Sequence, residues 1–196
     1  MDAVAALRAG LPVLLPTDTV YGLCALAESE AAVHALYQLK GRGEKQPTAL
    51  VAASVDVLLD RIPELAGRGE AIARALLPGP YTLVLPNPVR RYAWLTGARP
   101  DTIGVRVARL PPAAQRVLDE VAAVAATSAN EPGDPAGATL DEVPERIRAA
   151  CGAELDAGRL PGAASTVIDF TGAEPAVLRE GAAPSADALA RAALAT

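Results

Sequence analysis

The stretch LLPTDTVYGLCALA at residues 14–27 decides how this chain folds. An apolar run typical of a β-strand ends at Pro16, and a second β-prone run begins at Val20. The hydroxyls and the carboxylate between the two runs favour the rim of a sheet over its core, because polar side chains there can face a ligand. A second break of this kind, VAAVAATSAN, occupies residues 121–130. We expect the two rims to belong to one site.

The composition is that of a folded globular protein. The 196 residues are 51% hydrophobic and 21% charged, which favours one domain over residues 1–196 with a sizeable core. The net charge of −5 argues against a whole-domain nucleic-acid binder. Cys24 and Cys151 fit no metal or redox spacing, and the sequence contains neither a signal peptide nor a membrane-spanning run. We therefore expect a reduced, cytoplasmic setting, no membrane partner and no protein metal site.

Hydrophobic periodicity and turn residues predict a mixed α/β sheet with helices on its faces. We expect strands at residues 12–15, 21–25, 48–53, 81–85, 102–107, 121–126, 166–170 and 176–178. We expect helices at residues 2–8, 30–39, 55–59, 64–77, 111–120, 140–149 and 185–194, and a loop at residues 87–99. Several strands are joined too closely for right-handed crossovers, so these pairs must be antiparallel.

Common catalytic signatures are missing from the sequence. His34 is the one histidine, and its place on a predicted helix favours packing over general-base chemistry. The motifs GxSxG, HExxH, CxxC and GxxxxGK[ST] do not occur. A zinc enzyme, a triad hydrolase and a Walker-type ATPase are therefore disfavoured.

Lysine occurs only at Lys40 and Lys45, whereas arginine supplies the other sixteen basic residues. Ammonium and guanidinium groups are not interchangeable against phosphate, so the pair indicates a need for an ammonium, with chance clustering as the alternative. Lys40 and Arg42, one glycine apart, can converge on an anion where a helix ends. The alternative is that both are ordinary C-terminal cations, which the helix dipole favours.

Further polar candidates lie at strand ends. Arg106, between valines in a predicted strand, needs a partner, either a ligand carboxylate or a structural salt bridge. Ser128 and Asn130 point the same way if the backbone stays extended, although turn chemistry explains them equally. Ser165 and Arg179 flank the last two strands. Cations and hydroxyls without a carboxylate pair suit the alignment of anionic substrates better than acid–base hydrolysis.

Eight segments, in order, resemble the YrdC-like family of threonylcarbamoyl-AMP synthases: PTDTVYGL, LKGR, LLPGPYTLVL, WLTG, TIGVRV, TSAN, STVID and VLREG, over about residues 10–182. The resemblance implies the YrdC-like twisted mixed (parallel and antiparallel) sheet flanked by helices, with a deep central cavity, in the short single-domain form. It implies that L-threonine, bicarbonate or CO2, and ATP form L-threonylcarbamoyladenylate and pyrophosphate for tRNA t6A37 modification. Mg²⁺ would come with the triphosphate, and the downstream partner would be the tRNA threonylcarbamoyl-transfer machinery.

The resemblance also assigns roles to residues. The implied catalytic elements, Lys-x-Arg and Ser-x-Asn, fall on Lys40, Arg42, Ser128 and Asn130. The implied threonine contacts are Thr19, Arg106, Ser128 and Ser165. The implied ATP contacts are Lys40, Arg42, Gln46, Thr102, Asn130 and Arg179. Asp18 has no such role, and we expect it to order its loop.

Two other readings stay open. A paralogue of the same fold could carry a different carbamoyl-adenylate activity. A module of this fold could instead bind double-stranded RNA on a concave basic face through Arg90 and Arg91. RNA affinity that falls on reversal of these two charges, but not on a change at Thr19, would favour the binding module.

Overall fold

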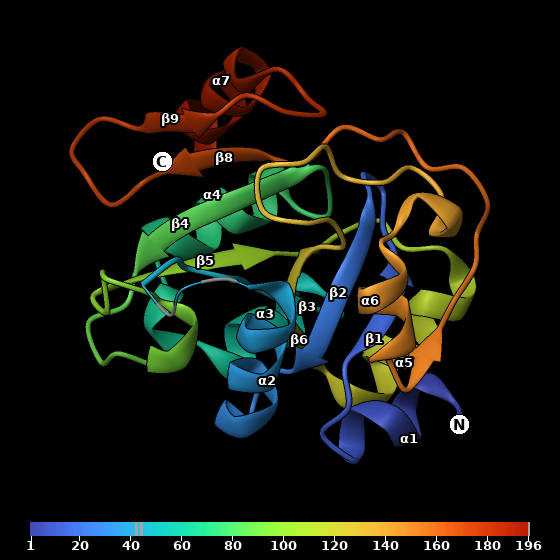
Figure 1. Cartoon of the computed structure of the whole chain (residues 1–196). Helices are drawn as coiled ribbons and strands as arrows, with labels where there is room; N and C mark the ends of the chain where they lie inside the picture. The colour runs from blue at the N-terminus through green and yellow to red at the C-terminus, as the bar shows by residue number, and fades with distance from the viewer. Residues whose placement is uncertain (42, 44, 196) are drawn as a thin grey trace.

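One mixed sheet organises the chain, in the part that the computed structural model describes, residues 1–41, 43 and 45–195 (Figure 1). Its nine strands in these residues lie in the order β7-β1-β2-β6-β3-β5-β4-β8-β9. The strands are β1 (Val13–Pro16), β2 (Tyr21–Leu26), β3 (Ala49–Ala52), β4 (Tyr81–Pro86), β5 (Thr102–Arg106), β6 (Ala123–Ser128), β7 (Ala153–Glu154), β8 (Thr166–Asp169) and β9 (Ala176–Arg179). The predicted mixed sheet is confirmed.

Strands that are consecutive in sequence and paired in the sheet are antiparallel. The closely joined strands β1 and β2 pair antiparallel, with Pro16 opposite Tyr21, so the polar segment between them forms the turn. Strand pairs β2/β6, β3/β6, β4/β5 and β8/β9 are also antiparallel. Parallel pairing occurs in β1/β7, β3/β5 and β4/β8, none of which are consecutive strands, as a parallel connection requires a crossover.

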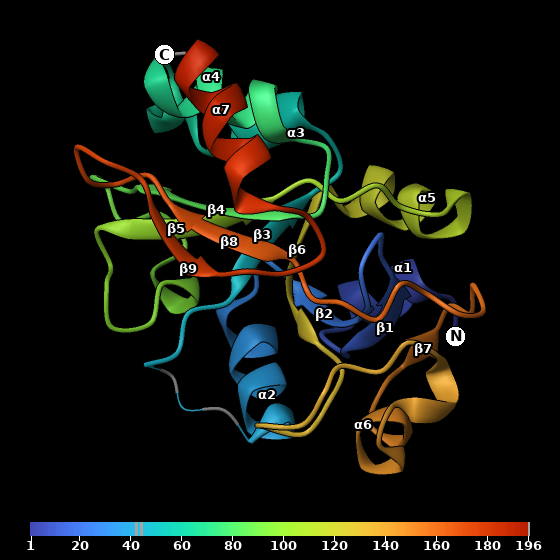
Figure 2. The ribbon, with the colours of Figure 1, turned by 90° about the horizontal axis from the view of Figure 1, so that it is seen from above.

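Helices cover the two faces of the sheet unequally. The α-helices are α1 (Ala3–Arg8), α2 (Glu30–Lys40), α3 (Val55–Arg61), α4 (Arg68–Leu76), α5 (Pro112–Val121), α6 (Glu145–Ala149) and α7 (Ser185–Ala195). The larger core joins one sheet face to α2, α4 and α7, and Figure 2 shows α4 and α7 side by side over the strands. The smaller core joins the other face to α1 and α5. No helix in the described residues has the length and apolar character that a bilayer crossing requires.

The helix starts have local causes. Asp2, Ser29 and Ser54 cap α1, α2 and α3, because each side chain accepts a hydrogen bond from a backbone N–H of the first turn. Helix α2 ends at Gly41, whose left-handed φ of 64° suits glycine.

Several predicted elements were wrong in extent. The helix expected at residues 64–77 is a 3₁₀ turn, η1 (Pro63–Leu65), followed by α4, because Gly67 adopts a φ of 85° between them. The helix expected at residues 140–149 divides into η3 (Leu140–Glu142) and α6, with Pro144 at the N-cap. The loop expected at residues 87–99 contains the 3₁₀ turn η2 (Ala93–Leu95), and the two-residue strand β7 was not predicted.

Candidate active site

A pocket of about 470 Å³ lies on the sheet face that α1 and α5 cover only in part. Alternation along β5 shows how the sheet forms it: Thr102, Gly104 and Arg106 line the pocket, whereas Ile103 and Val105 pack into the larger core. Small residues at such lining positions leave room for a ligand. The pocket is thus the uncovered part of one sheet face, bordered by the strand ends at which the sequence places its polar residues.

The turn between β1 and β2 builds one end of this pocket. The Thr17 hydroxyl donates to Val20 O at 2.7 Å and accepts from the backbone N–H groups of Thr19 and Val20 at 3.2 Å each. The Asp18 carboxylate accepts from the guanidinium of Arg106 and, at 3.1 Å, from the backbone N–H of Arg109. Hydroxyl and carboxylate therefore fold the turn and fix an arginine, as expected for Asp18.

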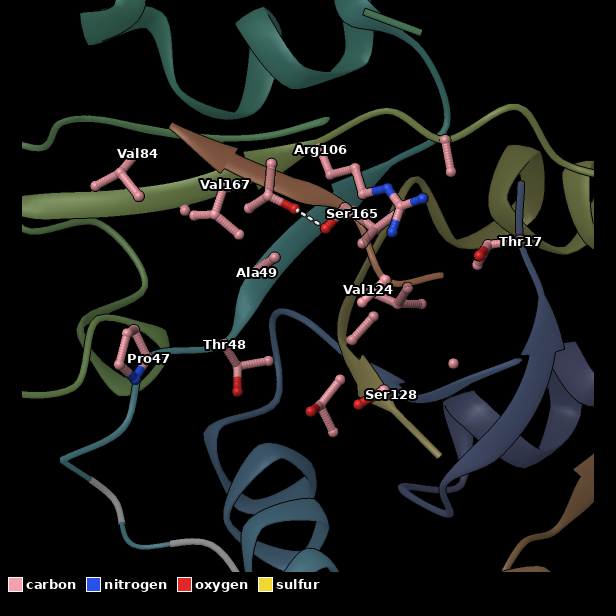
Figure 3. A pocket seen from close by; sticks show the side chains of 18 of the residues that line it. Thr17, Pro47, Thr48, Ala49, Val84, Arg106, Val124, Ser128, Ser165 and Val167 are labelled. Atoms are coloured by element: carbon pink, nitrogen blue, oxygen red, sulfur yellow. Dashed lines mark hydrogen bonds between the residues drawn. The ribbon is translucent and has the colours of Figure 1, made fainter. Parts of the chain in front are cut away.

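Arg106 brings a charge into the pocket from β5 (Figure 3). Its side chain is 10% exposed, and its Nη2 donates to Asp18 and, at 2.9 Å, to the fully buried Thr19 hydroxyl. Burial lowers the pKa of the Arg106 guanidinium, and Asp18 opposes that effect. Its Nε is buried without a hydrogen-bond partner. Arg106 therefore forms a structural salt bridge with Asp18, and its Nε–H remains available to donate a hydrogen bond to a ligand.

A second arginine reaches the pocket from β9. Arg179 donates from Nη2 to Ser165 O at 2.8 Å and to the Ser165 hydroxyl at 3.1 Å, and that hydroxyl lies 2.8 Å from the Thr82 hydroxyl. Burial, and secondly the charge of Arg106, lower the pKa of Arg179. Two guanidinium groups that repel one another across a partly apolar pocket favour an anionic ligand between them.

Lys40 has a structural position that the sequence did not reveal. Its buried ammonium, at the last residue of α2, donates to Ser128 O and Asn130 Oδ1 at 2.7 Å each, and also to Asn130 O. The Ser128 hydroxyl donates to Asn130 Oδ1 at 2.5 Å. Lys40 therefore ties α2 to the turn after β6. It does not belong to the pocket lining.

The predicted site residues divide into three groups. Thr102, Arg106, Ser128, Ser165 and Arg179 line the pocket. Four further residues lie outside the lining. The Thr19 hydroxyl accepts from Arg106, and the Lys40 ammonium donates to Asn130, whose side chain in turn accepts from Ser128. Gln46 is exposed. Arg42 lies outside the described residues.

Sequence reasoning missed Thr82, whose hydroxyl lies beside that of Ser165, and the far end of the pocket, which Lys45, Thr48, Thr96 and Arg99 help to line. These residues come from a loop, two strand borders and a turn, and none belongs to a recognisable spacing. The two lysines were noted as a pair, but the structure gives them different surroundings: Lys40 is buried and Lys45 is exposed.

Gly97 holds the Lys45 segment in place. Its φ is +61°, and a Cβ there would lie 2.5 Å from Lys45 O and 2.8 Å from Pro47 N. We expect Gly97→Ala to lower the free energy of unfolding by about 2–4 kcal/mol, because strain and a backbone clash add. Urea unfolding measures this loss. Gly10→Ala is the matched control, since Gly10 has φ +79° with nothing within 4 Å. Equal losses in both variants would show that the close approach is unimportant.

Among the described residues, the pocket lining includes no histidine, aspartate or glutamate that could act as a general base. Burial raises the pKa of the Cys24 thiol in the pocket wall to about 12, so the thiol is neutral. The described residues include no group of three His, Cys, Asp or Glu side chains placed to hold a metal ion. The arrangement can bind and align anions, and its hydroxyls can orient polar substrate atoms.

Comparison with known proteins identifies relatives of this chain. The family model Sua5/YciO/YrdC, described as "Telomere recombination", matches residues 5–181. The threonylcarbamoyl-AMP synthase of Xanthomonas euvesicatoria is 35% identical over 184 residues, which cover 91% of this chain and 90% of the relative. The crystal structure of Pyrococcus abyssi Sua5 complexed with L-threonine is 34% identical, with a TM-score of 0.80, and is similar over 94% of this chain and 54% of that one. Escherichia coli YciO, at 26% identity, also gives a TM-score of 0.80, over 93% of this chain and 88% of that one.

Proposed function

This chain belongs to the Sua5/YciO/YrdC family, and from that membership we propose that it is a threonylcarbamoyl-AMP synthase. Its substrates are L-threonine, bicarbonate or CO2, and ATP, and its products are L-threonylcarbamoyladenylate and pyrophosphate. The observation that carries the proposal is the pocket itself, where the guanidinium groups of Arg106 and Arg179 face one space beside the hydroxyls of Ser128 and Ser165. We place the product upstream of tRNA t6A37 modification in the cytoplasm, with a threonylcarbamoyl-transfer machinery as consumer.

The chemistry needs charge neutralisation more than a protein nucleophile. The threonine amine adds to CO2 and loses a proton to water, which gives a carbamate. A carbamate oxygen then attacks the α-phosphorus of ATP, the bond to the β-phosphate oxygen breaks, and pyrophosphate leaves. Mg²⁺ would be held mainly by phosphate oxygens and water, because the described residues supply no cluster of metal ligands.

Each end of the pocket has a proposed role. Arg106 binds the carboxylate of the substrate threonine, and the side chains of Thr19 and Asp18 hold the Arg106 guanidinium in place. Ser128 and Ser165 orient the amino acid. Arg179 and Thr102 contact the nucleotide.

The remaining predicted residues act at the border of the pocket. Lys40 and Asn130 fix the turn that carries Ser128 and support catalysis through it. Direct ATP contacts from Lys40, Arg42, Gln46 and Asn130 stay predictions.

The structure weakens the alternative of an RNA-binding module, because one of the two arginines that it requires is paired with a carboxylate. Arg91 forms a bidentate pair with Glu64, at 2.6 Å from Nε and 2.7 Å from Nη2, so its charge is largely neutralised. Such a pair leaves less positive field for a phosphate backbone.

Direct product analysis tests the proposed function. Purified protein is incubated with ATP, bicarbonate and labelled threonine, and the mixture is analysed for a threonine-containing adenylate and for pyrophosphate. We expect both products, and neither when ATP, threonine or bicarbonate is omitted. An adenylate formed with another amine or carbamoyl donor, but not with threonine, would overturn the proposal.

A further inference from the structure

Two buried side-chain polar atoms have no hydrogen-bond partner in the described residues: Arg106 Nε and Thr48 Oγ1. Both residues line the same pocket. A buried polar atom without a partner costs free energy, so native proteins leave few of them, and one in the wall of a pocket is a candidate for a ligand contact. Arg106 already has a proposed ligand. Thr48 does not.

Other threonine hydroxyls of the pocket contrast with Thr48. The hydroxyl of Thr96 donates to Ala93 O at 2.8 Å, and that of Thr102 donates to Arg99 O at 3.1 Å. Thr48 is 4% exposed, and its backbone N–H donates to Leu95 O at 2.9 Å, which fixes the residue just before β3. Its hydroxyl is therefore held at the pocket wall with its hydrogen-bonding capacity unused.

The sheet register separates this hydroxyl from the amino-acid end of the pocket. Val51 of β3 lies beside Arg106 of β5, and Thr48 precedes Val51 by three residues. At about 3.3 Å per residue, Thr48 lies about 10 Å along the sheet from Arg106. A ligand that fills both ends must therefore extend well beyond the threonine that Arg106 binds.

Apolar side chains form part of the wall near Thr48, together with Lys45 and Arg99, and the Arg99 guanidinium is paired with Asp169. Figure 3 shows Pro47, Ala49, Val84 and Val167 on the same side of the pocket as Thr48, away from Ser128 and Thr17. This apolar part of the wall suits a flat, uncharged heterocycle with a polar edge.

We propose that the Thr48 hydroxyl hydrogen-bonds to the nucleoside part of ATP and contributes to nucleotide selection. The inference rests on the proposed function, because it takes the long ligand to be the adenylate. Thr48 is then a binding residue, remote from the atoms that react.

Thr48→Val tests the proposal, because it keeps the shape of the side chain and removes only the hydroxyl. We expect the Michaelis constant for ATP to rise roughly 3- to 10-fold, as for loss of one hydrogen bond, while that for threonine changes less than twofold. Thr48→Ser restores the wild-type value. We also expect the ligand-free valine variant to melt at or above the wild-type temperature, because it no longer buries an unpaired hydroxyl.

Thr96→Val is the matched control for stability. It removes a hydroxyl that has a partner, so its ligand-free melting temperature should fall by roughly 2–4 °C. A fall of the same size in Thr48→Val, with unchanged ATP affinity, would overturn the proposal. A rise in the Michaelis constant for threonine instead of ATP would also overturn it.

Calorimetric binding of a non-hydrolysable ATP analogue separates this inference from the proposed function. Weaker analogue binding by Thr48→Val supports the inference even if no threonine adenylate forms. Equal analogue binding by the wild type and Thr48→Val overturns the inference even if the wild type is a fully active synthase.

Discussion

We expect Arg106→Lys to lower kcat/KM for threonine by about 30- to 1,000-fold, which corresponds to about 2–4 kcal/mol of lost charge-assisted binding. The reason is geometric. Asp18 and Thr19 occupy Nη2, and the rest of the planar guanidinium remains for a carboxylate, whereas an ammonium is a single point that Asp18 would hold. Steady-state kinetics with varied threonine and saturating ATP measure the loss.

Arg109→Lys serves as the control for this change. Arg109 is an exposed neighbour whose backbone N–H donates to Asp18, whereas its side chain makes no such bond, so we expect wild-type kinetics.

A second variant tests stability. Arg106→Met should have a lower free energy of unfolding than the wild type, because it leaves the Asp18 carboxylate without its cation. The double variant Asp18→Asn/Arg106→Met should regain stability without activity. Threonine kinetics within threefold of wild type in Arg106→Lys would contradict the role.

We expect Lys40→Met to lower the free energy of unfolding by about 3 kcal/mol and to abolish most turnover. The buried ammonium donates to three acceptors in the turn after β6, and methionine leaves all three without it. For a chain of this length, the loss corresponds to a fall in melting temperature of roughly 6–12 °C. Urea unfolding and the adenylate assay measure the two effects.

Lys45→Met is the natural control, because Lys45 is the other lysine of the chain and is exposed. We expect its stability to stay within about 0.5 kcal/mol of wild type. Lys40→Arg should fold but turn over slowly, since a guanidinium does not fit three acceptors arranged around a single nitrogen. If Lys40→Arg retains full turnover, the lysine pair in the sequence reflects chance clustering.

Local patterns predicted most of the fold. Alternating apolar residues, capping serines and close connections identified the main strands and the antiparallel pairs, because each depends on neighbours in sequence. Gly67 and Pro144 also interrupt helices locally. The apolar periodicity continues across both residues, however, so each pair of elements was predicted as one helix. Strand β7 has two residues, too few for any periodic pattern.

The site was less predictable because it depends on distant contacts. Arg106 and Ser165 were recognisable as polar residues at strands that should be apolar. Thr48 was not, because its significance lies in a missing partner, which only the packed structure can show. Lys40 was noticed for its rarity, yet its acceptors lie 88 and 90 residues away. Which sheet face stays uncovered is likewise decided by where α1 and α5 pack.

Strand β9, which carries Arg179 to the pocket, lies at an edge of the sheet. All four of its residues are exposed, and among the described residues it pairs with β8 alone. Edge strands of this kind open locally at lower free-energy cost than the rest of a domain. Each opening withdraws Arg179 while Arg106 stays in place on an interior strand. A substrate that bridges the two arginines would stabilise the edge by RT ln(1 + [L]/Kd), where [L] is the free substrate concentration. We therefore expect amide hydrogen exchange in β9 to slow as substrate is added, to an extent set by the substrate affinity.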